Sequence, residues 1–311
     1  MKHIFIINPK AGKGDGVSRI YAMAEKLRRE HGLAAECMLT QSRGHATELV
    51  RSRAATGEEL RFYACGGDGT VNEVAAGIVG YPNAAMTAIP IGTGNDFLKN
   101  FGSDAVKFSD AENLFDGPVQ ELDLIDCNGR PVLTVACSGI DARIAADVHR
   151  YSSRPLVDGK TSYLLSAMFN FLYRGIGERW TVYLDGAEQA EHDYALIAVC
   201  NGRHYGGGFM PVPEAGMCDG KLNTLLVRKV SRARFGTALT DYMKGKYKKY
   251  PQFITPSDAK EIRIVSEEEP IVTCLDGEIV RNHEVVIRLS GHKLRFFGPA
   301  GCSPDKSRRE G

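Results

Sequence analysis

Residues 66–74 of this 311-residue chain form the glycine-rich stretch Gly66-Gly-Asp-Gly-Thr-Val-Asn-Glu-Val74. It follows the apolar run Phe62–Cys65 directly, and apolar residues then recur at helical spacing as far as Ile78. A buried strand therefore leads into a turn and a helix. Because glycine lets a ligand approach the backbone and a helix N-terminus presents free N–H groups, this stretch predicts an anion-binding turn.

The same alternation of strand and helix extends to both sides of this stretch. Residues 3–7, Cys37–Leu39 and Met86–Ile91 are further strand-like runs, and segments with helical spacing separate them. Alternation of this kind predicts a parallel sheet. We therefore expect an α/β domain with a parallel sheet over residues 1–121.

Two more loops rich in small residues follow predicted strands, at 8–14 and at 92–96. Any one of the three loops is explained as a tight turn, but ligands of open α/β sheets bind at the carboxyl ends of the strands, where all three loops lie. Together they predict a shared polyphosphate site. The chain has neither a GxxxxGK[ST] motif nor a GxGxxG motif after its first strand, which excludes the P-loop and dinucleotide fingerprints.

The pattern changes from about Leu122, where short alternating or apolar runs are separated by Gly, Asp or Asn turns. This predicts a β-rich, sandwich-like domain over residues 122–291, with helical inserts around Tyr163–Tyr173 and Phe235–Tyr247. Residues 292–311 comprise a strand that we expect to return to the first domain, followed by a polar tail.

Composition excludes several classes of protein. The formal net charge is +1, so no overall field favours nucleic acid, and no apolar run reaches the length of a membrane-spanning helix. The eight cysteines contain no CxxC pair and no zinc spacing, and neither the histidines nor a GxSxG motif supports a hydrolase. The apolar run at the N-terminus is too brief for a signal peptide, so we expect a cytoplasmic protein.

Three motifs, in order and spacing, resemble the catalytic domain of the diacylglycerol kinase family of lipid kinases, which includes sphingosine and ceramide kinases. They are Asn8-Pro9, Gly66–Val74 and Pro90-Ile-Gly-Thr-Gly-Asn-Asp-Phe97. The resemblance continues into the second domain, so that it covers nearly the whole chain. The motifs that carry it there are Asn201-Gly202, Tyr205–Phe209, Pro213–Ala215 and Asp219–Leu222.

The resemblance implies that ATP and Mg²⁺ are the cofactors. It assigns Asp68 as a catalytic carboxylate that acts through magnesium, a role that suits a hard cation bridging phosphate oxygens. The alternative is a turn aspartate bonded to its own loop. The nucleotide-binding residues implied by the resemblance are Asn8, Pro9, Lys10, Thr40, Gly66, Gly67, Asp68, Gly69, Thr70, Asn72, Glu73, Thr93, Asn95 and Asp96.

In the second domain the resemblance makes Glu278 the general base that accepts the proton of the lipid hydroxyl. From the residues alone, Asp276-Gly277 predicts a hairpin turn and Glu278 an exposed strand residue. The resemblance also implies that Asp123 takes part in a water-mediated magnesium network, although a polar residue on an exposed strand face explains it nearly as well. A structural magnesium would bind Asp219 with the backbone carbonyls of Gly216 and Lys221.

These observations predict an ATP-dependent lipid kinase whose leading acceptor is diacylglycerol, giving phosphatidic acid. The alternatives are an NAD kinase-like enzyme, a sphingoid or other lipid kinase, and a non-catalytic lipid- or nucleotide-binding protein on the same scaffold. The basic tract Arg232–Tyr250 predicts either peripheral contact with an anionic membrane that presents the lipid, or a solvated helix face. No nucleic-acid partner is expected, and a homodimer is left open.

Overall fold

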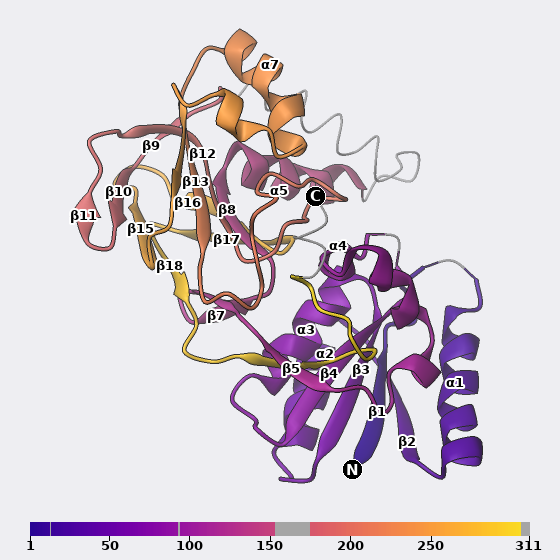
Figure 1. Ribbon diagram of the computed structural model, residues 1–311. Helices are drawn as coiled ribbons and strands as arrows, with labels where there is room; N and C mark the ends of the chain where they lie inside the picture. The colour runs from indigo at the N-terminus through magenta and orange to yellow at the C-terminus, as the bar shows by residue number, and fades with distance from the viewer. Residues whose placement is uncertain (13, 93, 153–174, 306–311) are drawn as a thin grey trace.

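The computed structural model describes residues 1–12, 14–92, 94–152 and 175–305, which form two lobes (Figure 1). Thr93 and the helical insert expected around Tyr163–Tyr173 lie outside these residues, as does the end of the tail. Side chains are described for all of these residues except 148–152.

The first lobe is built on a six-stranded sheet in the order β2-β1-β3-β4-β19-β5. Neighbouring strands from β2 to β19 run parallel, and β5 is antiparallel to β19. The strands are β1 (Lys2–Ile7), β2 (Ala34–Leu39), β3 (Leu60–Gly66), β4 (Ala84–Pro90), β5 (Val119–Leu122) and β19 (Leu294–Phe297).

Helices connect these strands and bury one apolar side each. Helix α1 buries Ile20, Ala24 and Leu27 at helical spacing and ends at Gly32, whose left-handed φ of 64° lets its N–H bond back to the last turn. The helical segments of this lobe are α1 (Gly16–His31), α2 (His45–Ala54), α3 (Asp68–Ile78), α4 (Asp96–Lys99), η1 (Gly102–Ser109) and η2 (Ala111–Asn113).

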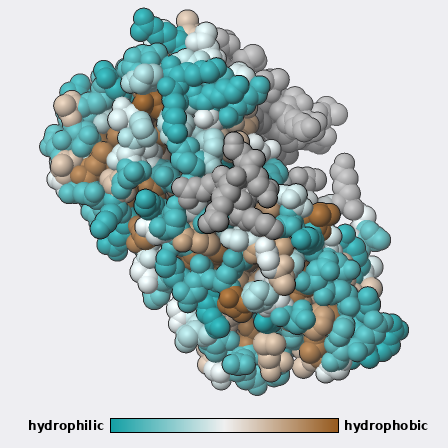
Figure 2. All heavy atoms as spheres, in the orientation of Figure 1, coloured by the Kyte–Doolittle hydropathy of each residue, from teal (hydrophilic) through white to brown (hydrophobic). Residues whose placement is uncertain are grey.

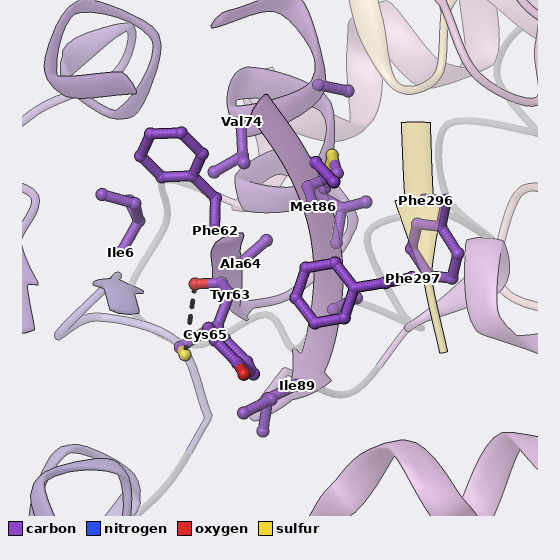
Figure 3. Packing of buried hydrophobic residues seen from close by; sticks show 14 of the residues in the cluster. Ile6, Phe62, Tyr63, Ala64, Cys65, Val74, Met86, Ile89, Phe296 and Phe297 are labelled. Atoms are coloured by element: carbon purple, nitrogen blue, oxygen red, sulfur yellow. Dashed lines mark hydrogen bonds between the residues drawn. The ribbon is translucent and has the colours of Figure 1, made fainter. Parts of the chain in front are cut away.

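The core of the first lobe includes side chains from both ends of the chain (Figure 3). The Tyr63 ring stacks on Phe5 with ring centroids 4.2 Å apart, and Phe297 of β19 meets Tyr63 edge-on at 5.2 Å. Phe296, also on β19, is fully buried and packs against Phe97. The C-terminal strand is therefore part of the first lobe's core.

The second lobe consists of two antiparallel sheets, in the orders β11-β10-β15-β18-β6-β7 and β14-β13-β12-β8-β16-β17, and β9 pairs with β12. An apolar cluster that includes Trp180, Ile197 and Ile287 lies between the sheets. The predicted combination of a parallel α/β lobe and a β sandwich is confirmed.

The strands of this lobe are β6 (Ile125–Cys127), β7 (Arg130–Val132), β8 (Val135–Gly139), β9 (Glu178–Arg179), β10 (Thr181–Leu184), β11 (Ala187–Glu188), β12 (Asp193–Cys200), β13 (Asn223–Arg228), β14 (Ile254–Ser257), β15 (Glu261–Val265), β16 (Ile271–Leu275), β17 (Glu278–Asn282) and β18 (Glu284–Leu289). Its described helices are α5 (Ile140–Ser152), α7 (Arg232–Met243) and η4 (Tyr247–Lys249). The second expected insert corresponds to α7 and η4.

The surface of the face drawn in Figure 2 is mostly hydrophilic over the second lobe, and apolar residues occur in small separate areas. This is usual, since single apolar residues on a surface need no partner. In the part of the chain that the structure describes, no helix is both long enough and apolar enough to cross a membrane.

Candidate functional site

The three glycine-rich loops of the first lobe touch one another at the carboxyl ends of β1, β3 and β4. A Cβ atom added to Gly92 would lie 2.8 Å from the Cα of Gly67. A Cβ on Gly12 would lie 2.3 Å from the Ile91 carbonyl oxygen, and Gly12 also has a φ of 75°. Glycine is thus required at these two positions by loop-to-loop contact, and the loops form one continuous surface.

These loops form the floor of a large cleft of about 610 Å³ between the lobes. The turn at Asp276–Glu278 of the second lobe lies opposite them. The cleft is lined by Asn8, Lys10, Ala11, Gly12, Thr40, Gln41, Ser42, Arg43, Ala46, Gly67, Gly69, Thr70, Glu73, Gly92, Gly94, Asp276, Gly277 and Glu278. It thus collects residues predicted separately from five segments of the chain.

Hydrogen bonds hold the first loop against the start of α3. Asn8 Nδ2 donates to Thr70 Oγ1 over 3.4 Å, and the Lys10 backbone N–H donates to Asn8 Oδ1 over 3.0 Å. Thr40 is anchored at the end of β2 by a backbone bond to Ile7. Asn8 therefore orders its loop, which keeps the Lys10 side chain beside the cleft.

Some predicted nucleotide-binding residues support the cleft without lining it. A Cβ on Gly66 would lie 2.2 Å from Thr70 Oγ1, so Gly66 makes room for the helix start. Asn95 has a φ of 52° and donates from Nδ2 to the Gly92 carbonyl over 2.7 Å, which shapes the third loop. Pro9 is exposed and is not among the described residues that line the cleft.

Glu73 lines the cleft, but its carboxylate is engaged within the protein. It accepts the backbone N–H groups of Gly44 over 2.9 Å and of Ala46 over 3.1 Å, at the start of α2. These are groups that a helix N-terminus leaves unpaired. Glu73 thus fixes the loop that carries Arg43.

Asp68 begins α3 and belongs to a smaller cavity beside the cleft. One carboxylate oxygen accepts the Phe97 N–H over 3.1 Å, so Asp68 is bonded to the start of α4 and not to its own loop. Burial raises the pKa of Asp68, and hydrogen bonds from the Phe97 and Asp96 backbones oppose the rise. A half-buried carboxylate that is costly to charge is a suitable partner for a cation.

Asp276 does more than form a hairpin turn. Its φ is 47°, and its carboxylate accepts backbone N–H groups of Leu133 (2.6 Å), Thr134 (3.1 Å) and Val135 (2.9 Å). Its carbonyl accepts Asn72 Nδ2 of α3 over 3.2 Å. Burial raises the pKa of Asp276 to about 6 despite these bonds. This role was not predicted from the sequence, because the turn already explains Asp-Gly.

Glu278 directly follows this turn and forms an ion pair with Arg43 of the first lobe. Glu278 Oε1 lies 2.9 Å from one terminal nitrogen of Arg43 and 3.2 Å from its Nε. Both side chains are substantially exposed, at 41% and 70%. Arg43 was not predicted, although an arginine in a loop at a strand end was a usable signal for an anion site.

The smaller cavity, of about 260 Å³, adjoins the large cleft and shares Asp276 and Gly277 with it. At the edge of this smaller cavity, Asp96 of the first lobe accepts the N–H of Gly207 of the second lobe over 2.7 Å, which links the two lobes. Its lining residues are Asp68, Asn72, Asp96, Phe97, Thr134, Val135, Cys137, Asp141, Ala145, His204, Tyr205, Gly206, Phe209, Cys274, Asp276 and Gly277. We call it the inner cavity.

Asp123 and Asp219, which were predicted to hold further magnesium ions, are hydrogen-bonded within the protein. Asp123 is fully buried rather than on an exposed strand face, and its carboxylate pairs with the Lys293 ammonium and accepts the Gly220 N–H over 2.7 Å. Asp219 accepts the Lys221 N–H over 3.1 Å, and Gly216 is buried nearby in the chain.

Within the described residues, no group of three or more His, Cys, Asp or Glu side chains is arranged to hold a metal ion. A site at Asp219 would therefore depend mainly on backbone carbonyls such as those of Gly216 and Lys221. The magnesium roles of Asp123 and Asp219 stay predictions.

Two family models together match most of the chain. Residues 2–127 match the diacylglycerol kinase catalytic domain, and residues 134–298 match the YegS C-terminal NAD kinase beta sandwich-like domain. A probable lipid kinase YegS-like of Pseudomonas fluorescens is 28% identical over 228 residues, which is 71% of this chain and 70% of that protein. A diacylglycerol kinase of Staphylococcus epidermidis is 27% identical over 275 residues, covering 88% and 84% of the two chains.

Solved structures agree on the fold. A putative diacylglycerol kinase from Bacillus anthracis superimposes with a TM-score of 0.73 at 23% identity, covering 97% of this chain and 98% of the other. An NAD kinase from Archaeoglobus fulgidus in complex with ATP gives a TM-score of 0.51 at 16% identity, with 96% and 94% covered. At these identities the likeness concerns the fold alone.

Proposed function

The chain belongs to the diacylglycerol kinase family of lipid kinases, and we propose that it transfers the γ-phosphoryl group of ATP to the hydroxyl of a lipid. Diacylglycerol, which would give phosphatidic acid, is the first acceptor to test because the relatives carry its name. The observation that carries the proposal is the position of Glu278, which enters from the second lobe opposite three glycine-rich loops.

The large cleft supports nucleotide binding by its size and its donors. Its volume of about 610 Å³ lies within the roughly 300–1,000 Å³ typical of ligand sites. Backbone N–H groups at the start of α3 and the cations Lys10 and Arg43 face the same space, where a triphosphate would bind. The loop contacts at Gly12, Gly67 and Gly92 keep these donors preorganised.

The residues present also fit a magnesium ion at Asp68. Its half-buried carboxylate lies beside the third glycine-rich loop, where a Cβ on Gly94 would be 2.8 Å from Asp68 Oδ2. A protein usually holds nucleotide-bound magnesium with one or two carboxylates. Such an ion, when bound, would offset negative charge on the phosphoryl oxygens.

In the transfer itself, the lipid hydroxyl oxygen bonds to the γ-phosphorus while the bond from that phosphorus to the bridging oxygen of ADP breaks. Glu278 accepts the hydroxyl proton. Because the inner cavity meets the large cleft at Asp276 and Gly277, a head group in the inner cavity would present its hydroxyl next to Glu278. The apolar walls formed by Phe97, Val135 and Phe209 suit the start of a lipid chain.

The basic tract supports a further proposal, peripheral contact with an anionic membrane surface. Phe235, Tyr242 and Tyr247 of the tract are buried in the second lobe, and Tyr250 is half-buried with its hydroxyl bonded to Asp241, so the aromatic rings offer little surface to a membrane. Its lysines are exposed, although Lys248 pairs with Glu214 and Lys249 with Asp241. Membrane contact by this surface would therefore be electrostatic and weakened by salt.

The kinase proposal is tested by incubating the protein with Mg-ATP and a total lipid extract, and by detecting new phosphorylated species with mass spectrometry. Parallel reactions contain dioctanoylglycerol micelles or NAD. We expect a phosphorylated lipid and no NADP. Formation of NADP alone, or phosphorylation of neither, would overturn the proposal.

A further inference from the structure

A chain of hydrogen bonds ends on a carboxylate in the wall of the inner cavity. Tyr205 donates its hydroxyl hydrogen to Asp141 Oδ2 over 2.5 Å, and the Tyr242 hydroxyl lies 3.1 Å from that of Tyr205. Since the Tyr205 hydrogen is engaged, Tyr242 is the donor in the second bond. Burial and the neighbouring Asp141 raise the pKa of both tyrosines well above its usual value, so both hydroxyls stay protonated.

The Asp141 carboxylate has acceptor capacity left over. Among the described residues it receives one hydrogen bond, from Tyr205, whereas a carboxylate offers about four acceptor sites. Burial raises the pKa of Asp141, which means that its charge is poorly solvated where it lies. A hydrogen-bond donor that reaches this carboxylate would therefore be strongly favoured.

Of the two cavities that Asp141 lines within the described residues, the inner cavity is the one large enough to admit such a donor. Behind Asp141, under α7, lies a second void of about 10 Å³ with walls that include Leu196, Phe235 and Ile254. This void is at most large enough for one water molecule, which requires roughly 10–15 Å³. The inner cavity, at about 260 Å³, is just below the roughly 300–1,000 Å³ of complete ligand sites, so it fits a head group rather than two acyl chains.

We propose that Asp141, oriented by Tyr205 and Tyr242, binds a second hydrogen-bond donor of the acceptor lipid, a hydroxyl or ammonium group next to the hydroxyl that is phosphorylated. The inference rests on the proposed kinase activity and narrows its acceptor. Monoacylglycerols carry such a pair as a diol, and sphingoid bases carry it as an amino alcohol. Diacylglycerol has one hydroxyl, and its ester carbonyls only accept hydrogen bonds.

The charges around the inner cavity agree with this class of acceptor. Its described lining includes four carboxylates, Asp68, Asp96, Asp141 and Asp276, and no Lys or Arg side chain. Lys99 is close by but pairs with Asp96. An anionic phospholipid head group would be repelled there, whereas a neutral diol or a cationic amino alcohol would not.

The test compares octanoylglycerol, dioctanoylglycerol and sphinganine as acceptors in identical detergent micelles with Mg-ATP. We expect kcat/KM for at least one of the two-donor acceptors to exceed that for dioctanoylglycerol by about tenfold or more, the scale of one hydrogen bond to a charged group. Equal use of all three acceptors, or preference for dioctanoylglycerol, would overturn the inference and leave the kinase proposal standing. A protein that phosphorylates none of them would overturn both.

Variants of Asp141 and Tyr205 test whether these residues cause the preference for acceptors with two donors. Asp141→Ala should reduce that preference to within about threefold while leaving the KM for ATP unchanged. Asp141→Asn keeps an acceptor oxygen but not the charge, so it should penalise sphinganine more than octanoylglycerol. Tyr205→Phe, which leaves the carboxylate unoriented, should give an intermediate loss.

The matched control is Tyr247→Phe, because Tyr247 donates to Glu214 in a second tyrosine–carboxylate pair of the same lobe, outside the inner cavity. It should leave the acceptor preference unchanged. If Asp141→Ala lowered kcat/KM for all three acceptors equally, Asp141 would be structural and the inference wrong. If Asp141 variants failed to fold in a thermal melt, the wild-type preference and Tyr205→Phe would decide.

Discussion

The glycine-rich loops of the first lobe and the Asp276–Glu278 turn of the second lobe line the large cleft in different ways. The loops contribute mainly backbone groups, held by contacts that leave no room for a side chain at Gly12 and Gly92. The turn contributes side chains, and Asp276 holds it in place through three backbone N–H groups. In the proposed mechanism, the first lobe therefore binds the charged phosphates, and the second lobe positions the carboxylate that accepts the proton.

Three polar contacts join the two lobes beside the large cleft and the inner cavity. Asn72 donates to the Asp276 carbonyl, Asp96 accepts the Gly207 N–H, and Arg43 pairs with Glu278. Each involves a residue at the cleft or the inner cavity. Substitutions in the glycine-rich loops should therefore affect mainly nucleotide binding, and substitutions in the Asp276–Glu278 turn should affect mainly phosphoryl transfer.

The largest effect is expected for Glu278→Gln, which removes the proposed base without changing the shape of the side chain. kcat should fall by roughly 10²-fold or more, the usual scale of general-base loss, while the affinity for ATP stays within about twofold. Steady-state kinetics and ATP titration measure the two effects. Glu284→Gln is the matched control, since Glu284 is an exposed glutamate on β18 that pairs with Arg263. Activity within a few-fold of wild type would remove Glu278 from the mechanism.

A substitution in the glycine-rich loops, on the other side of the cleft, should instead weaken ATP binding. Gly92→Ala places a Cβ 2.8 Å from the Gly67 Cα, so the two loops must separate. We expect the KM for ATP to rise by about tenfold to a hundredfold, because donors misplaced by even about 1 Å can cost that much. Gly291→Ala is the control, since nothing lies within 4 Å of its added Cβ. An unchanged KM would mean that the loops do not bind the phosphates.

Arg43→Gln tests the residue that connects the two sides. The exposed pair with Glu278 contributes only about 0–1 kcal/mol, so a triphosphate can readily take over the guanidinium. We expect the KM for ATP to rise by roughly fivefold to tenfold, with a smaller change in kcat. Arg53→Gln on α2, where Arg53 pairs with Glu36, provides the control. A lower kcat with no change in KM would assign Arg43 to Glu278 alone.

The pH dependence of stability tests how the second-lobe turn is held. The folded pKa of Asp276, about 6, is above its unfolded value of 3.8, so folding disfavours the charged form. This penalty is complete above pH 6 and disappears as the pH falls toward 3.8. Between pH 7 and pH 5 the group should recover about 1 kcal/mol of unfolding free energy.

Denaturant unfolding at both pH values measures this recovery. Asp276→Asn cannot titrate and should lack it, although the amide cannot accept all three N–H groups and the variant should be less stable at each pH. An identical pH dependence in the two proteins would contradict the shifted pKa.

The smallest effect on nucleotide binding and phosphoryl transfer is expected in the basic tract, which lines neither the large cleft nor the inner cavity. Replacing Lys244, Lys246, Lys248 and Lys249 with glutamine should weaken binding to anionic vesicles, at up to about 1 kcal/mol per lysine at low salt, and leave ATP binding unchanged. Vesicle sedimentation at two salt concentrations measures this. Unchanged sedimentation would leave the solvated-face interpretation of the tract.

Residue patterns predicted the scaffold and much of the cleft. Strand and helix periods, together with glycines at three strand ends, were sufficient to predict the α/β lobe with its parallel sheet, and short alternating runs predicted the sandwich. Local signals suffice here because each depends on neighbours within a few residues. The resemblance to the kinase family, rather than a local pattern, added Lys10, Thr40 and Glu278. These three residues line the large cleft together with Asn8, Gly67, Gly69 and Thr70.

Other parts of the site could not be predicted from the sequence. Asp276 bonds to residues more than 140 positions away, Arg43 meets Glu278 across 235 positions, and Asp141 meets Tyr205 across 64. No local pattern records such pairs, because they form only when two lobes and two sheets have packed. The sequence determined where the glycine-rich loops follow the strands, and the tertiary structure decided which carboxylates face them and what each carboxylate contacts.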